Sequence, residues 1–211
     1  MTRDDAASTR SRAGLADKRR AILAGALAVF ARDGYSRASI DAIAATAGVS
    51  TRTIYNHFHC KADLFEVVIQ ESATRVAEAQ IAIIDRHLSK VTELESDLIE
   101  LGRAWTTPMP DYAEHFALVR QINAEVEHIP RTAIEAWQET GPLRVRRELA
   151  RHLQQLANRG LLRIDDPDRA ALHFAQLISI PNPAYRGTLS AEEIAEVVSA
   201  GVRVFLHGYV G

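Results

Sequence analysis

Residues 51–58 carry side chains that can contact nucleic acid if they form a helix. In this run, TRTIYNHF, the apolar residues Ile54 and Phe58 stand four positions apart, so a helix would turn both inward. The opposite face would then present Thr51, Arg52, Tyr55 and Asn56. Arginine can donate two hydrogen bonds to guanine and asparagine can pair with adenine, while threonine, tyrosine, histidine and lysine can bind phosphate oxygens. A generic surface helix shows the same pattern, so that interpretation stays open on the pattern alone.

The elements that would position this face lie directly before it. The segment from Ser39 to Phe58 predicts two short helices joined by a turn at Gly48, with Ser39 and Ser50 as their N-caps. Apolar side chains in both helices would pack on each other and on an earlier helix at 17–33, which ends at a glycine, Gly34. This arrangement is a helix-turn-helix.

The rest of the chain predicts an all-α fold of about ten helices with no convincing strand. Apolar residues recur at spacings of three and four through most of the sequence, and prolines and glycines separate the segments. Besides the helices above, the pattern predicts helices over 61–86, 91–105, 112–126, around Trp137, 143–159 and 167–180, and a last one opened by a capping box from Ser190 to Glu193. Residues 1–16 have no apolar periodicity and predict a disordered tail.

Composition excludes several classes of protein. The chain has 211 residues, 47% apolar and 25% charged, with a formal net charge of -2, which argues against a surface that coats nucleic acid or acidic membrane throughout. Up to Lys61, however, there are 10 Lys and Arg against 5 Asp and Glu, and beyond it 15 against 22. A small basic N-terminal part joined to a larger acidic part is consistent with an N-terminal nucleic-acid-binding domain, the head, followed by a domain of another kind, the body.

The single cysteine, Cys60, cannot form an internal disulfide and favours a reducing compartment. The first residues lack the apolar core of a signal peptide, and no segment approaches the roughly 20 apolar residues that cross a bilayer. We therefore expect a cytoplasmic protein that does not contact membrane.

The run from residue 19 to 65 resembles the DNA-binding domain of the TetR family of bacterial transcriptional regulators. The matching positions are Phe30, Gly34, Tyr35, Ile43, Ala44, Ala47 to Ser50, Tyr55, His57, Phe58, Lys61 and Leu64. Residues 143–209 are similar to the AefR-like type of C-terminal domain found in part of that family. The resemblance implies a tail at 1–16, a helix-turn-helix DNA-binding domain at 17–60, and a helical ligand-binding and dimerisation domain at 61–211.

The resemblance also implies roles for single residues in the head. Ser39, Tyr55, His57 and Lys61 would bind phosphates, Arg52, Thr53 and Asn56 would lie nearest base edges, and Thr51 could do either. Phosphate contacts set affinity and register, whereas base contacts set sequence. Cys60 departs from the family, which has Ser, Asn or Asp before the lysine as a helix cap. It is interpreted as an ordinary free cysteine, with a redox-sensitive thiol as the alternative.

The body contains a candidate site for a small molecule. Its large aromatic residues gather in a stretch broken by prolines, and two polar residues fall on inward spacings of their helices. The candidate effector-binding residues are Trp105, Met109, Tyr112, Phe116, Asn123, Trp137 and His173. Since members of the family commonly bind an inducer in this domain, the cluster favours a largely apolar or aromatic effector. Plain core packing is the alternative for each residue.

The last two predicted helices carry apolar residues on more than one face, which favours burial against a partner. The candidate dimer-interface residues are Phe174, Leu177, Ile178, Val197, Val198, Gly201, Val202 and Phe205. In the family, two C-terminal helices pair with their symmetry mates as a four-helix bundle. A twofold dimer would place two recognition helices in successive major grooves, about 34–36 Å apart, so the operator would be a palindrome.

No motif supports an enzyme, a cofactor or a metal site. The sequence lacks a nucleophile elbow and a glycine-rich phosphate loop, and His57, His59 and Cys60 do not have zinc-ligand spacing. The Glu-x-x-His element from Glu125 to His128 occurs once, where di-iron bundles need two, and is interpreted as a solvated helix end. We therefore expect a homodimeric, ligand-responsive transcriptional regulator, most simply a repressor. The alternatives are a DNA-binding regulator controlled by a protein partner and, remotely, a helical metal protein or enzyme.

Overall fold

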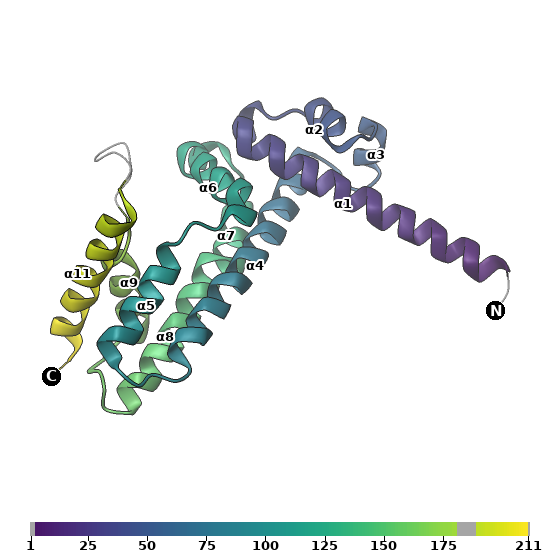
Figure 1. The fold of residues 1–211 in the computed structure, drawn as a ribbon. Coiled ribbons are helices and arrows are strands. Elements are labelled where there is room, and N and C mark those ends of the chain that lie inside the picture. The colour runs from purple at the N-terminus through teal and green to yellow at the C-terminus, as the bar shows by residue number, and fades with distance from the viewer. Residues whose placement is uncertain (1–2, 181–188, 211) are drawn as a thin grey trace. The chain divides into compact units, whose positions relative to one another are not determined.

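The computed structural model describes residues 3–180 and 189–210, and within these ranges the chain is helical with no strand. It divides into two compact units (Figure 1). The first unit contains residues 1–76 and 110–140, and the second contains residues 77–109 and 141–211. These units do not coincide with the predicted division after residue 60, because the segment 110–140 packs with the head.

The first unit is built around a long N-terminal helix. Its elements are α1 (Arg3–Arg37), α2 (Ile40–Ala47), α3 (Thr51–Tyr55), the first part of α4 (Lys61–Leu88), the short 3-10 turns η1 (Pro110–Tyr112) and η2 (Val126–His128), α6 (Ala113–Glu125) and α7 (Arg131–Thr140). Helix α1 packs against α2 and against α6, so α6 belongs to the same core as the helix-turn-helix.

Helix α1 differs from the prediction at its start. The sequence predicts a disordered tail at 1–16, whereas the helix in the structure begins at Arg3. Alanine and arginine, frequent in this stretch, are good helix formers, and the packed turns that follow provide a helix to extend. The break at Gly34 is as expected, since this residue has a positive φ of 79° and the helical path is interrupted there.

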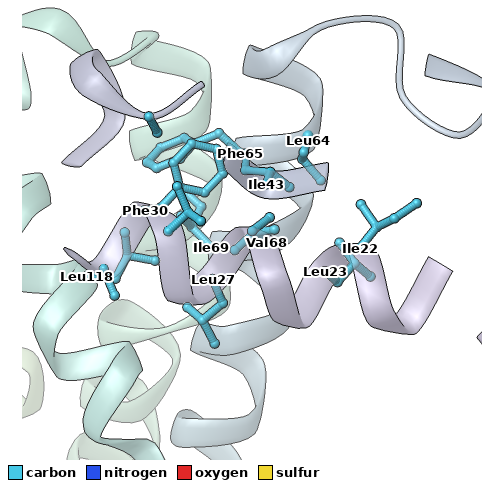
Figure 2. Close-up of a cluster of buried hydrophobic side chains, with 14 of the residues drawn as sticks. Ile22, Leu23, Leu27, Phe30, Ile43, Leu64, Phe65, Val68, Ile69 and Leu118 are labelled. Carbon is cyan, nitrogen blue, oxygen red and sulfur yellow. The ribbon is translucent and has the colours of Figure 1, made fainter. Parts of the chain in front are cut away.

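Figure 2 shows the core of the first unit, in which aliphatic and aromatic side chains of α1, α2, α4 and α6 interleave. Phe30 is fully buried and meets Phe65 edge to face, with ring centroids 4.9 Å apart. Tyr35 meets the same Phe65 ring at 4.7 Å. This packing fixes the end of α1 against α4, and the segment between them carries α2 and α3.

The second unit is a separate helical bundle. Its elements are the rest of α4, α5 (Leu94–Thr106), α8 (Pro142–Asn158), α9 (Pro167–Leu177) and α11 (Ala191–Tyr209). Asp166 caps α9 and the predicted capping box between Ser190 and Glu193 opens α11, which confirms both predicted helix starts.

Helices α9 and α11 approach each other closely at Gly201. A Cβ added there would overlap the carbonyl oxygen of Leu177, so α11 can lie this near to α9 only with glycine at that position. Phe174 and Phe205 meet edge to face beside it, at 5.3 Å between ring centroids. None of the described helices is both long and apolar enough to cross a membrane.

Candidate nucleic-acid interface and ligand cavity

Two serines and a glycine set the geometry of the helix-turn-helix, as the sequence predicts. The Ser39 hydroxyl accepts a hydrogen bond from the amide of Ala42, and the Ser50 hydroxyl accepts one from the amide of Thr53. Gly48 ends α2 in the left-handed conformation, at φ 65°. These residues define both ends of α2 and the start of α3, and the two serine caps stabilise the helix starts.

Helix α3 is shorter than predicted, since it ends at Tyr55 and not at Phe58. The chain leaves the helix through Asn56, and the amides of His57 and Phe58 both donate to the Ile54 carbonyl. Ile54 and Phe58 are nonetheless both buried, as expected. The inward-facing residues are thus predicted correctly, although the helix carrying them is not continuous.

The outward side of α3 and its following turn is open to solvent. Arg52, Tyr55 and Asn56 are exposed, and Tyr55 keeps 54% of its surface accessible although it is a large aromatic residue. Thr51, Thr53 and His57 are half-buried. The Thr53 hydroxyl lies 2.9 Å from the Ser50 hydroxyl and is therefore engaged within the turn. The exposed Arg52, Tyr55 and Asn56 are the candidate reading face of this unit.

Ser39 keeps a donor although its side chain caps α2. The hydroxyl oxygen accepts from Ala42 at 3.1 Å, and the residue itself is exposed. Its O–H therefore remains able to donate to an acceptor in solvent. A phosphate oxygen is such an acceptor.

Lys61 does not lie as we expected from the sequence. Its Nζ donates to the carbonyl oxygens of Tyr35, Ser36 and Ala38, at 2.9, 3.3 and 3.1 Å, and stands 4.7 Å from the centre of the Tyr35 ring. An ammonium group has three donors, so this geometry uses all of them. Lys61 therefore holds the backbone between α1 and α2 in place and has no donor left for a phosphate.

Glu125 is a residue whose role sequence reasoning missed. It was interpreted as part of a solvated helix end, yet only 12% of its side chain is exposed. Its carboxylate accepts a hydrogen bond from the amide of Ser36 at 2.9 Å, and Arg37 lies 3.9 Å away. These contacts lower the pKa of Glu125, chiefly through the Ser36 amide. The last residue of α6 thus binds the segment that leads into α2.

Cys60 precedes α4 and is exposed. The side chain that helps begin this helix is Asp63, whose carboxylate accepts from the amide of His59 at 3.0 Å. An acidic residue in the first turn stabilises a helix start. The N-terminus of α4 therefore has a side-chain partner in spite of the cysteine.

The seven candidate effector-binding residues are divided between the two units. Tyr112, Phe116, Asn123 and Trp137 belong to the first unit, and Trp105, Met109 and His173 belong to the second. Two of the expected orientations are wrong. Asn123 is exposed, and His173 is also exposed, with its Nδ1 2.8 Å from the Tyr209 hydroxyl. The spacing of apolar residues in these two helices therefore did not show which face is buried and which adjacent face is exposed.

Trp105 lines a cavity of about 290 Å³ in the second unit. Its walls come from α4, α5, α8 and α9 and are mostly apolar, with Leu143, Leu149 and Ala171 among the lining residues and with Gln80 and Arg146 as the polar ones. The first unit has a larger hollow of about 460 Å³, whose lining includes the charged residues Arg20, Glu71 and Arg75. The cavity at Trp105 has the mostly apolar character of small-molecule sites.

Most of the candidate dimer-interface residues are in the core of the second unit. Phe174, Ile178, Val198, Gly201, Val202 and Phe205 are all buried within the single chain. They cannot form the outer face of a dimer, so this part of the prediction is wrong. Leu177 and Val197 are half-buried. The large apolar side chains that α9 and α11 leave exposed are Leu172 and Val204, at 42% and 57% exposure.

In the second unit, the guanidinium of Arg151 lies among three residues of types that can bind a metal ion. Asp85, Glu148 and His152 bring their ligand atoms within 4.8 Å of one another. Arg151 Nη2 contacts Glu148 and lies 2.9 Å from His152 Nε2 and 3.6 Å from Asp85. The guanidinium therefore supplies the positive charge between these carboxylates.

A buried histidine in the first unit was also not anticipated. His115 is 8% exposed, and its Nδ1 lies 2.9 Å from the hydroxyl of Ser72, which is 2% exposed. Burial, with the nearby charge of Arg75, lowers the pKa of His115 from 6.5 to about 4. The imidazole is therefore neutral near pH 7. The sequence signal was its spacing, three and seven positions before the apolar Leu118 and Ile122, which are also buried in α6.

Similarity to known proteins agrees with this architecture. A family profile described as bacterial regulatory proteins of the tetR family matches residues 22–68, and one described as the C-terminal domain of AefR-like transcriptional repressors matches residues 96–211. The transcriptional repressor AcnR of Corynebacterium diphtheriae is 39% identical over 64 residues, which cover 30% of this chain and 34% of that repressor.

Two solved structures are similar along nearly the whole chain. A protein of Mesorhizobium loti assigned to the TetR family is 31% identical, with a TM-score of 0.80 over 93% of this chain and 98% of that one. The flavonoid-responsive regulator FrrA is 28% identical, with a TM-score of 0.66 over 92% of this chain and 97% of that one.

The capped helix-turn-helix with its exposed candidate reading face, in a chain whose described residues form helices and no strand, defines a DNA-binding transcriptional regulator. The chain belongs to the TetR family of bacterial transcriptional regulators. Its members are regulators and not enzymes, which confirms the prediction that the chain has no catalytic activity.

Proposed function

We propose that this protein is a homodimeric repressor that binds a palindromic DNA operator in the cytoplasm and is released from it by a small, largely apolar or aromatic effector. The observation that carries the proposal is the exposed reading face of α3, held in a turn whose two helices are both capped. Its side chains match the donors and acceptors of base edges and phosphates.

In this proposal Arg52 and Asn56 read bases in the major groove, and Tyr55 binds phosphate. Thr51, Thr53 and His57 lie at the edge of the same surface, where half-burial restricts them to contacts with a close backbone or base. Ser39 donates its free O–H to a phosphate at the start of α2. Lys61 acts as a positioning residue, since its three donors already hold the segment between α1 and α2.

The dimer is proposed to form on the outer side of α9 and α11. Val197, Ala200 and Val204 stand at positions i, i+3 and i+7 of α11, and none of them is buried within the chain. Leu172 adds an exposed apolar side chain from α9. A twofold axis on this face would generate two reading faces, and these would fit major grooves about one DNA turn, roughly 34–36 Å, apart.

The effector is proposed to bind in the cavity at Trp105. The mostly apolar lining suits an aromatic molecule, and the structurally similar FrrA is flavonoid-responsive. An effector releases DNA only to the extent that it binds the released form more tightly than the DNA-bound form. Within the first unit, α6 contacts α1 and its Glu125 binds the segment before α2, so a shift of α6 would move the reading face.

Selection of binding sequences from a random DNA pool tests the proposal. The salt should be near physiological, where unspecific phosphate binding is weak and base readout survives. We expect the wild-type protein to enrich a palindrome. Arg52→Ala should relax the selected sequence at one or two positions of each half-site, with a cost of about 1–3 kcal/mol for the preferred base.

The matched control is Arg86→Ala, which removes the same charge from an exposed position in the second half of α4. It should enrich the same palindrome as the wild type. Failure of a folded, dimeric wild-type protein to enrich any sequence would contradict the proposed function. Equal losses for both variants would contradict the role given to Arg52.

A further inference from the structure

The cavity at Trp105 contains a charged residue with an unused donor. Arg146 lies on α8 between the buried residues Val145 and Leu149, and all three line the cavity. Its Nε is buried and has no hydrogen-bond partner within the described part of the chain. No carboxylate of the described residues pairs with its guanidinium, in contrast to Arg151 further along the same helix.

A buried guanidinium N–H without an acceptor destabilises a protein, since the donor has lost its water. Here the residue that carries the donor lines a mostly apolar cavity, where a bound molecule could supply the acceptor. A carboxylate is the simplest match, because its two oxygens can accept the paired N–H groups of one arginine side. Gln80, from α4, lines the same cavity and offers a further amide donor.

We propose that the cavity binds an aromatic carboxylate, with Arg146 as the residue that binds the anion and Trp105 as the aromatic wall. This inference rests on the proposed function and narrows its effector to an anion. The volume of about 290 Å³ is at the small end of ligand pockets, so the molecule has one or two rings. One guanidinium balances one carboxylate, and the apolar walls disfavour a more highly charged ligand.

The test is isothermal titration calorimetry of the full chain without DNA. The probes are benzoate, cinnamate and 2-naphthoate, each compared with its neutral amide, which has nearly the same shape. We expect at least one carboxylate to bind about tenfold or more tightly than its amide, as one hydrogen bond to a charged group implies. In Arg146→Gln this preference should fall to less than about twofold.

The control is Arg147→Gln, which removes the same charge from the next, exposed position of α8, outside the cavity lining. It should keep the preference for the carboxylate. Arg146→Lys, which retains the charge without the paired N–H groups, should give an intermediate preference. If Arg146→Gln does not fold, the comparison of Arg146→Lys with the wild type still measures the contribution of the guanidinium.

The inference is overturned if carboxylates and amides bind equally, if the preference survives in Arg146→Gln, or if no carboxylate binds at millimolar concentration. Measuring operator affinity in the presence of the same probes distinguishes failure of this inference from failure of the proposed function. A carboxylate that binds through Arg146 without releasing DNA supports the inference and contradicts ligand response through this cavity. A neutral molecule that releases DNA equally from the wild type and from Arg146→Gln supports a ligand-responsive regulator and contradicts the inference about Arg146.

Discussion

Replacement of Glu125 tests how α6 is joined to the DNA-binding head. The Glu125 carboxylate accepts from the Ser36 amide at 2.9 Å while only 12% of its side chain is exposed. Ser36 stands three residues before Ser39, the cap of α2. Glu125→Ala removes the acceptor and leaves the Ser36 amide to solvent, whereas Glu125→Gln keeps an oxygen acceptor and removes the charge.

The expected cost follows from the type of hydrogen bond. A bond to a charged group contributes about 1.5–3 kcal/mol, and the lower end applies here because Ser36 itself is exposed. Glu125→Ala should therefore lower the free energy of unfolding by about 1.5 kcal/mol. For a chain of this length, that corresponds to a fall in Tm of about 3–6 °C. Glu125→Gln should cost less than half as much.

The effect of Glu125→Gln should depend on pH. Because the Ser36 amide lowers the pKa of Glu125 in the folded protein, its charge stabilises the fold above the unfolded pKa of about 4.3. That contribution is lost as the pH falls through the lower, folded value. The difference between wild type and Glu125→Gln should thus be constant from pH 7 to about pH 5 and disappear in stronger acid.

Urea unfolding at several pH values measures these differences, and operator affinity measured alongside reports on the position of α2. Glu127→Ala is the control, because it removes the same charge from an exposed position two residues away. If Glu125→Ala and Glu127→Ala unfold at the same urea concentration, the Ser36 contact contributes nothing and the reasoning is refuted.

Three further predictions concern single residues. Lys61→Met should lower the Tm by several degrees and weaken specific and random DNA binding without changing the slope against salt, because its donors bind carbonyl groups; a flatter slope would contradict this. Gly201→Ala should destabilise the second unit by about 1–3 kcal/mol in urea, whereas Gly208→Ala, with open space at its Cβ, should not. As the pH falls from 6.5 toward about 4, the wild-type protein should lose stability that His115→Gln retains, because the buried imidazole must stay neutral while the unfolded chain takes up a proton; equal profiles would rule this out.

The local features of the head could be predicted because each depends on a few neighbouring residues. A serine before a helix and a glycine after it satisfy backbone groups within three or four positions, so Ser39, Gly48 and Ser50 were assigned correctly. The inward direction of Ile54 and Phe58 follows from their spacing in the same way.

The long-range contacts could not be predicted, because spacing shows that a side chain is covered and not what covers it. Phe174 and Phe205 have the pattern expected at a dimer interface, but they cover each other within one chain. Glu125 and Ser36 are 89 positions apart, and no pattern in either segment links them. Arg146 resembles the other arginines of its helix, and only the structure shows that it borders a cavity.

The engagement of Lys61 affects how chemical footprinting of this protein must be interpreted. The chain has three lysines, Lys18, Lys61 and Lys90, of which the first and last are exposed. Amine-reactive reagents modify the lone pair of a deprotonated, accessible nitrogen, and Lys61 Nζ is enclosed by three carbonyl groups. It should therefore resist labelling in the free protein, and its protection in a DNA complex would not indicate a DNA contact. For the same reason, acetylation of Lys61 would open the segment before α2, where acetylation of Lys18 or Lys90 would only remove a surface charge.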